Sequence, residues 1–272
     1  MKTLALVIAC ISLTLAAVPV MRALVRAWEL ERTNFQGRRV PTGFGFMLVL
    51  AAAPVYAAML FLSAPNVIVG SFLAALIGFG TIGLLDDIYG TREIGGFRGH
   101  LGLLRRGKVS TGLVKAVVGG CLGLGLGAVA ARFDPAISLL NGLVIGLAAN
   151  TLNLLDLRPG RAASCFWLGV LALAAARLGK LAIWAGLIPV LIPAVWLTML
   201  DRSARVMLGD AGSNAVGAIL GLALVYEAGV PARIVLVLIM IAVHLYAEKY
   251  SISELIEGNR VLRGVDRALG AR

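Results

Sequence analysis

Long apolar segments alternate along the chain with shorter polar connections. Nine apolar runs can be separated, most of them about 18 to 22 residues long. At 1.5 Å rise per residue, a helix of that length crosses a hydrocarbon core about 30 Å thick. The pattern therefore predicts transmembrane helices over Leu4–Leu24, Gly43–Leu62, Val67–Leu85, Thr111–Ala131, Ile137–Leu155, Ala162–Arg177, Leu181–Leu200, Ser213–Glu227 and Ile234–Ala247.

Two of these runs, Ala162–Arg177 and Ser213–Glu227, are short, so a tilted, kinked or partly re-entrant helix is expected for each. The count of spans is accordingly about nine, between eight and ten. The predicted fold class is an all-α, polytopic transmembrane helix bundle that forms one domain over residues 1–272. Composition agrees, because 60% hydrophobic residues and a mean hydropathy of +0.93 exceed what soluble domains carry.

The basic residues indicate the orientation. Most of the 25 Lys and Arg residues fall on alternate connections and on the C-terminal tail, and positive charge is retained in the cytoplasm. We therefore expect a multi-pass protein of the inner (plasma) membrane, with the N-terminus outside, the C-terminus in the cytoplasm and an uncleaved first span. The longer connections, and any site for a water-soluble substrate, then face the cytoplasm.

The net charge of +11 suits anionic headgroups and phosphorylated substrates, although topology signalling alone also explains part of it. Residues 248–272 form a basic tail with apolar residues at helical spacing. This pattern predicts a cytoplasmic amphipathic helix on the membrane surface, and a solvated basic tail is the alternative. Nothing in the pattern indicates a nucleic-acid partner.

Two adjacent carboxylates, Asp86 and Asp87, end the third run at the predicted cytoplasmic boundary. Adjacent carboxylates repel each other and are costly near lipid, so they require a cation or a proton. Mg²⁺ is the natural partner, because it combines one or two carboxylates with phosphate oxygens, and Mn²⁺ could replace it. A simple acidic helix end is the alternative.

Three polar residues, Asn150, Asn153 and Asp156, recur every three positions at the inner end of the fifth run. On a helix this spacing places them along one face. Such a stripe could read a base or a sugar through hydrogen bonds. Polar contacts that hold helices together are the alternative.

A third acid, Asp210, lies in the segment Met207 to Asn214, just before a helix that begins with small polar residues. Gly209 and Gly212 permit close backbone approach, and the N–H groups at a helix N-terminus favour phosphate. Ser213 adds a hydroxyl group. The segment is therefore a candidate phosphate or metal site.

Lys115 lies early in the fourth run, where a phosphate or carboxylate partner would offset its desolvation. The alternative is that the Lys115 side chain extends to the membrane–water interface and has no functional partner. Arg38, Arg39, Pro41 and Thr42 are expected to begin the second span, since proline suits a first helical turn.

The three cysteines, Cys10, Cys121 and Cys165, are isolated in the sequence and are expected to be packing residues. Glycines four residues apart predict close helix packing. Either an internal bundle contact or a homodimer interface would use them, so the oligomeric state is left open. These steps are Gly119/Gly123/Gly127, Gly142/Gly146 and Gly217/Gly221.

Taken together and in order, these motifs resemble the polyprenyl-phosphate N-acetylhexosamine-1-phosphate transferases, which include the phospho-N-acetylmuramoyl-pentapeptide and N-acetylglucosamine-1-phosphate transferases. The resemblance spans most of the chain. It rests on a basic Pro-Thr element, an aspartate pair, a lysine, an Asn-x-x-Asn-x-x-Asp run and a Gly-Asp-x-Gly-Ser element, which here are Arg39–Thr42, Asp86–Asp87, Lys115, Asn150–Asp156 and Gly209–Ser213.

The resemblance implies that Asp210 binds Mg²⁺ and that Asp86 or Asp87 deprotonates a lipid phosphate or helps to hold the metal, with Asp87 as the second expected ligand. It implies that the Asn153/Asp156 region reads the nucleotide. The partners would be a UDP-linked amino sugar and undecaprenyl phosphate, and UMP would leave. Direct attack and a covalent aspartyl-phosphate route both stay open.

Three departures separate this chain from the family pattern. Pro159 stands where a second acid usually follows Asp156, and Met207 stands where an aromatic residue is common. A histidine-rich cytoplasmic loop is missing, and neither His100 nor His244 replaces it. The resemblance therefore does not extend to the choice of sugar, and a non-catalytic scaffold or a transporter on the same fold is the alternative function.

Overall fold

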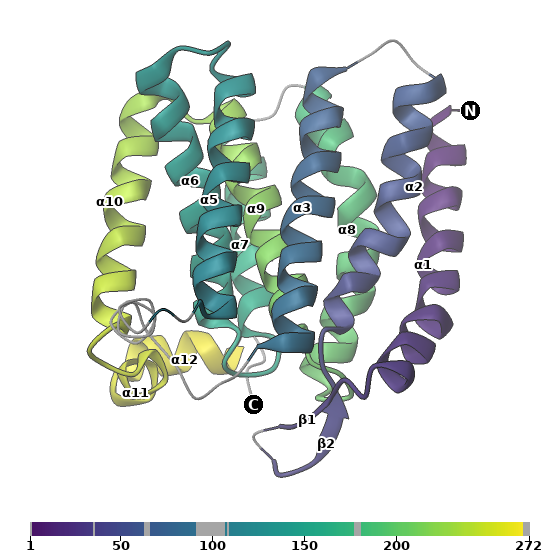
Figure 1. The fold of residues 1–272 in the computed structure, drawn as a ribbon, viewed down its shortest axis with the longest axis vertical. Coiled ribbons are helices and arrows are strands. Elements are labelled where there is room, and N and C mark those ends of the chain that lie inside the picture. Colours follow the sequence, from purple (N-terminus) through teal and green to yellow (C-terminus); the bar gives the residue numbers. More distant parts are fainter. Residues whose placement is uncertain are drawn as a thin grey trace.

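The computed structural model describes residues 2–34, 36–62, 66–90, 107, 109–176 and 181–268. It is 82% helical, and its long helices run side by side in one bundle (Figure 1). This confirms the all-α, polytopic fold class. The long helices are α1 (Lys2–Ala27), α2 (Met47–Leu62), α3 (Val67–Tyr89), α5 (Thr111–Ala130), α6 (Pro135–Leu155), α7 (Arg161–Ala175), α8 (Leu181–Arg202), α9 (Gly209–Glu227) and α10 (Val230–Ala247).

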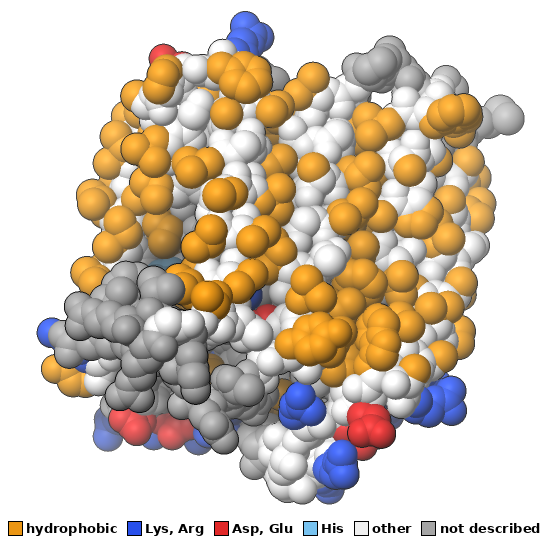
Figure 2. Space-filling model, viewed as in Figure 1, with side chains coloured by type: hydrophobic (Ala, Val, Ile, Leu, Met, Phe, Trp, Pro, Cys, Tyr) orange, Lys and Arg blue, Asp and Glu red, His pale blue; other side chains and the backbone are white. Residues whose placement is uncertain are grey.

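Each of the nine predicted spans corresponds to one of these helices, but not all of them have the length and composition of a span. Within the described ranges, seven helices are long and apolar enough to cross a membrane. The other two are α7, with 15 residues, and α9, whose first turns carry polar side chains. Figure 2 shows the consequence for the surface: hydrophobic side chains cover the flank, and most charged ones on this face lie at its lower end.

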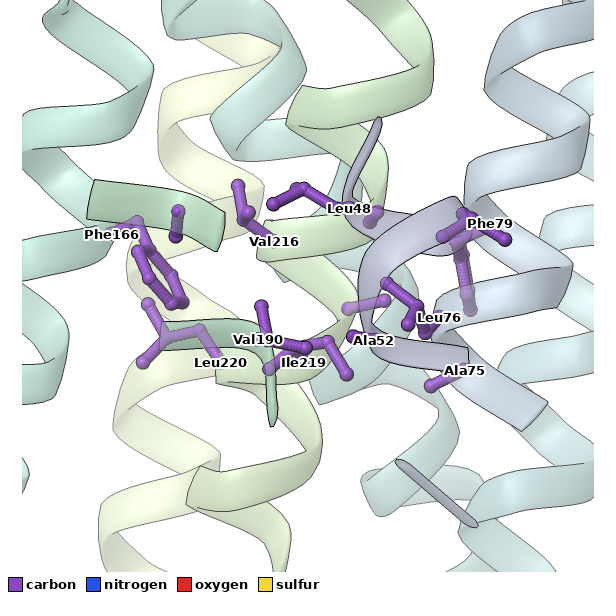
Figure 3. Packing of buried hydrophobic residues seen from close by; sticks show 14 of the residues in the cluster. Leu48, Ala52, Ala75, Leu76, Phe79, Phe166, Val190, Val216, Ile219 and Leu220 are labelled. Atoms are coloured by element: carbon purple, nitrogen blue, oxygen red, sulfur yellow. The ribbon is translucent and has the colours of Figure 1, made fainter. Parts of the chain in front are cut away.

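Helix α9 forms the centre of the bundle. Its most extensive contacts are with α6 and α3, and most of its side chains are buried. Figure 3 shows Val216, Ile219 and Leu220 of α9 packed among residues of the surrounding helices, including Phe166 and Val190. Because protein surrounds α9, it needs no wide lipid-facing surface, which explains why small residues replace large apolar ones along it.

All the glycines of the predicted steps except Gly146 lie where an added methyl group would contact another helix of this chain. A methyl group added to Gly217 would lie 2.6 Å from the carbonyl oxygen of Ala148, and one added to Gly123 would lie 3.0 Å from that of Gly142. Small residues allow this close backbone approach between helices in lipid. For these positions the structure therefore favours internal packing over a homodimer interface.

A short β-hairpin precedes α2, which corrects the expectation for the second span. Strands β1 (Glu31–Thr33) and β2 (Arg39–Pro41) pair antiparallel, with Arg32 opposite Val40. Pro41 therefore ends a strand and does not open a helix. The chain then passes through a 3₁₀ turn, η1 (Phe44–Phe46), before α2 begins at Met47. The left-handed conformation of Gly43, with φ +64°, allows this change of direction.

The C-terminal tail forms two short helices where one was expected. Helix α11 (Ile252–Gly258) and helix α12 (Arg260–Ala268) are separated at Asn259. The Asn259 side chain accepts hydrogen bonds from the backbone of Val261 and Leu262, so it caps α12. Both helices lie beneath the end of the bundle at which α10 finishes (Figure 1).

Candidate functional site: an acidic cluster at one end of the bundle

The last turn of α3 meets the first turn of α9 through the Asp87 carboxylate. Its Oδ1 accepts a hydrogen bond from the backbone N–H of Asp210 at 3.1 Å, and its Oδ2 accepts one from Ala211 at 2.9 Å. The first N–H groups of a helix have no partner within the helix, and the positive end of the helix dipole favours an anion there. Asp87 therefore caps α9 from a neighbouring helix.

Helix α9 begins at Gly209, four residues earlier than expected, which places Asp210 in its first turn and not ahead of it. Gly209 has φ +71°, and a methyl group there would lie 2.8 Å from Asp87 Oδ2 and 2.6 Å from the nitrogen of Gly43. A methyl group on Gly83 of α3 would overlap the backbone of Asp210. These glycines allow the two helix ends to approach closely enough for the cap to form.

The segment before α9 is also fixed from the other side. The N–H groups of Phe44 and Gly45 donate to the carbonyl oxygens of Met207 and Leu208, at 3.2 and 2.9 Å. The N–H of Met207 in turn donates to Pro41 at 2.7 Å. Pro41 of the basic Pro-Thr element and the turn η1 thus hold the backbone that leads to Asp210. Its arginine, Arg39, lies at the surface beside Glu31.

Lys115, from the first turns of α5, joins two carboxylates of the cluster. Its Nζ lies 2.8 Å from Asp86 Oδ2 and also forms an ion pair with Asp210 Oδ2. The side chains of Lys115 and Asp86 retain only 18% and 16% of their exposure. The partner that the sequence required for this buried lysine is therefore a pair of carboxylates from two different helices.

Asn153 of α6 completes the ring of polar groups. With its amide nitrogen toward Asp210 Oδ1 and its oxygen toward Lys115 Nζ, each at 3.0 Å, its donor and acceptor both match their neighbours. The Ser213 hydroxyl lies 3.0 Å from the same amide and donates to Gly209 at 2.9 Å. Four helices, α3, α5, α6 and α9, therefore contribute side chains to one cluster.

The other two residues of the Asn-x-x-Asn-x-x-Asp stripe, Asn150 and Asp156, lie in different surroundings. Asp156 lies just past the end of α6, where desolvation raises the pKa of its carboxyl well above the ordinary range and the nearby Asp201, Asp210 and Asp87 raise it further. Asn150 is half-buried one turn deeper, and its side chain forms no hydrogen bond to other described residues. Gly212 contributes packing, because its Cα lies against Gly45.

Asp201, at the end of α8, is a residue that sequence reasoning missed. It is 2% exposed, and its carboxylate accepts hydrogen bonds from the backbone of Gly160 at 2.6 Å and Leu208 at 3.2 Å. It therefore ties the α6–α7 turn to the segment that leads to Asp210. No motif spacing pointed to it, since in the sequence it was one polar residue at the end of an apolar run.

The cluster has the right chemistry for a hard cation but is not a ready-made metal site. Carboxylate and amide oxygens are the ligands that Mg²⁺ prefers. However, the described residues include no group of three or more His, Cys, Asp or Glu residues placed to hold a metal ion. Asp87 directs both oxygens to the α9 backbone, and Lys115 lies between Asp86 and Asp210. Asp86 and Asp210 are thus the two acids of the cluster whose carboxylates do not accept hydrogen bonds from described backbone N–H groups.

Two other sequence expectations have plain outcomes. The cysteines are unpaired: Cys10 is buried, Cys165 is half-buried and Cys121 is exposed on the bundle. His244 lies in α10, as expected, with Nδ1 2.7 Å from the carbonyl oxygen of Met240, so it is bound to its own helix. His100 lies outside the described residues.

Comparison with known proteins does not identify a relative: no family model and no curated protein matches this chain.

Proposed function

We propose that this chain is a Mg²⁺-dependent membrane transferase. It moves a sugar-1-phosphate, such as an N-acetylhexosamine phosphate, from a UDP-sugar to a polyprenyl phosphate, giving a polyprenyl-diphosphate-sugar and UMP. One observation carries the proposal: Asp86, Asp87 and Asp210, far apart in the sequence, meet around Lys115 and Asn153 at one end of a membrane bundle. The order of the motifs, which resembles that of the phosphotransferases described above, supports it.

The charge of the cluster favours a phosphate substrate that arrives with a cation. Three carboxylates against one ammonium group leave two negative charges when all are ionised. A diphosphate alone would be repelled, whereas one divalent cation balances the deficit. Positioning and charge neutralisation are the main needs of phosphoryl transfer, and Mg²⁺ held by Asp210 and one of the Asp86/Asp87 pair would supply the second of these.

The residues of this chain would then act as follows. Asp86 or Asp87 accepts the proton of the lipid phosphate. An oxygen of that phosphate attacks the phosphorus that carries the sugar, the bond from this phosphorus to the UMP oxygen breaks, and UMP leaves. Lys115 places positive charge beside the reacting phosphates, and Asn153 and Asp156 contact the nucleotide. The positive-inside bias would place this end of the bundle in the cytoplasm, below the plasma membrane.

The test is an assay of the purified protein with undecaprenyl phosphate, Mg²⁺ and a panel of UDP- and other nucleotide-sugars, with release of nucleoside monophosphate as the readout. Asp210→Asn and Asp87→Asn are expected to lower turnover by about 100-fold or more, the scale of losing one strong electrostatic contact in a transition state. Asp134→Asn is the matched control, because Asp134 caps α6 on the exposed surface, remote from the cluster. Unchanged turnover in Asp210→Asn would exclude the metal assignment.

A non-catalytic scaffold or transporter is the second candidate. It is favoured by the position of Lys115 between Asp86 and Asp210, and by Pro159 in place of the usual second acid. The same panel separates the two functions. Saturable binding of a nucleotide-sugar without turnover of any donor would support the scaffold, whereas release of UMP would support the transferase.

A further inference from the structure

A second charged site lies between the α6–α7 turn and the C-terminal tail. There the two parts line a half-open cavity of about 260 Å³. Its charged wall comes from two segments: Arg158 and Arg161 from the turn and the start of α7, and Arg263 and Arg267 from α12. Glu257, Asp266 and Ile256 complete the lining. None of these residues belongs to the acidic cluster.

Ion pairs hold the two walls together. Arg161 is 4% exposed and binds Asp266 through two parallel hydrogen bonds of 2.8 and 2.9 Å, with a third contact to Ser253 at 3.2 Å. Arg158 binds Glu257 at 2.8 Å. Paired arginine–carboxylate bonds fix geometry as well as charge. The cavity therefore lies between two docked surfaces, and the tail is not a loosely solvated chain.

The remaining two arginines leave the cavity with positive charge that the described residues do not balance. Four guanidinium groups face two carboxylates, and no described acidic residue forms an ion pair with Arg263 or Arg267. These two residues are four positions apart on α12, so they lie on the same face, where like charges destabilise a helix. Helix α12 has only nine residues, a length that is marginal without support from outside.

We propose that this cavity binds a phosphate-bearing anion, either the headgroup of a membrane lipid or a soluble phosphate compound. Guanidinium groups offer several planar N–H donors that match phosphate oxygens, and the α12 wall supplies two of them that have no acidic partner among the described residues. A phosphate would relieve the repulsion between Arg263 and Arg267, and Ile256 gives the rest of the ligand an apolar contact. The proposal does not depend on the transferase activity, because it uses no residue of the acidic cluster.

The experiment uses the full chain, without divalent cations, in nanodiscs. In the first arm, native mass spectrometry counts phosphatidylglycerol retained from mixed phosphatidylcholine and phosphatidylglycerol bilayers. In the second arm, calorimetry measures binding of inorganic pyrophosphate in phosphatidylcholine alone. The test variant is Arg263→Gln with Arg267→Gln. The control, Arg260→Gln with Lys249→Gln, removes the same charge from exposed positions outside the cavity.

Saturable binding in either arm that weakens about tenfold or more in the test variant, and stays within about twofold in the control, supports the site. The arm that shows it identifies the source of the phosphate. If binding weakens equally in both double variants, general surface charge explains it and the proposal is wrong. The absence of saturable binding in both arms would also overturn the proposal. Binding must also persist in Asp210→Asn. If it vanishes there, the anion occupies the acidic cluster and the proposed cavity site is wrong.

Discussion

Replacing Asp201 with alanine is the sharpest test of how the candidate site is held in place. The carboxylate accepts two backbone hydrogen bonds, from Gly160 and Leu208, in a position that is 2% exposed. Alanine leaves both N–H groups without their acceptor at a place that water barely reaches. The α6–α7 turn and the segment before Asp210 would then lose their common anchor.

The size of the effect follows from those two bonds. A hydrogen bond to a charged group contributes about 1.5–3 kcal/mol, so the two together contribute about 3–6 kcal/mol. Removing a buried carboxylate also removes its desolvation cost, which offsets part of the loss and leaves a net destabilisation of about 3 kcal/mol. For a chain of this length, 1 kcal/mol shifts Tm by roughly 2–4 °C, so Asp201→Ala should lower Tm by about 6–12 °C.

The assay is thermal unfolding of the purified protein in detergent, followed by tryptophan fluorescence. Asp134→Ala is the comparison, because it removes one exposed N-cap that accepts from Ile137 at 2.9 Å and should cost about 1 kcal/mol. Asp201→Asn keeps one acceptor oxygen but turns its NH₂ group toward the second N–H. Its loss of Tm should therefore lie between the losses caused by Asp201→Ala and Asp134→Ala. If Asp201→Ala lowers Tm no more than Asp134→Ala does, Asp201 does not anchor the α6–α7 turn to the segment before Asp210.

Three further predictions concern the cluster and the bundle. Asp87→Asn should lower both Tm and turnover, because Asp87 caps α9. Asp210→Asn should lower turnover with little change in Tm. Equal Tm values for the two variants would contradict the capping role of Asp87. Lys115→Met leaves Asp86 and Asp210 without their shared cation, so it should lower Tm in the absence of divalent cations. Addition of Mg²⁺ should then raise the Tm of this variant by more than it raises the Tm of the unmodified chain. An equal rise in both proteins would argue against a cation site. Gly217→Leu should prevent α9 from packing on α6 and lower Tm by about 10 °C or abolish folding, while Gly120→Leu, with open space around it, should have little effect; similar Tm losses would refute the packing argument.

The sequence by itself determined that the long helices are suited to a membrane and that the fold is all-α. Nine apolar runs became nine helices, because the length and polarity of a run are local properties that lipid selects directly. The alternation of helices also placed Asp86, Asp87 and Asp210 at one end of the bundle, because every second connection between helices lies at the same end. The activity itself stays a prediction.

Only the tertiary structure decided which of these polar groups touch. Asp87 lies 123 positions before Asp210, and its role as a cap for α9 depends on close contact at Gly83 and Gly209 that no local pattern reveals. The sequence likewise could not reveal the Asp201–Gly160 contact or the Arg161–Asp266 pair, because these contacts of 2.6 and 2.8 Å join groups that are 41 and 105 positions apart in the chain. Hydrophobic patterning fixes which segments enter the membrane, whereas hydrogen-bond geometry at helix ends is set by how those segments pack.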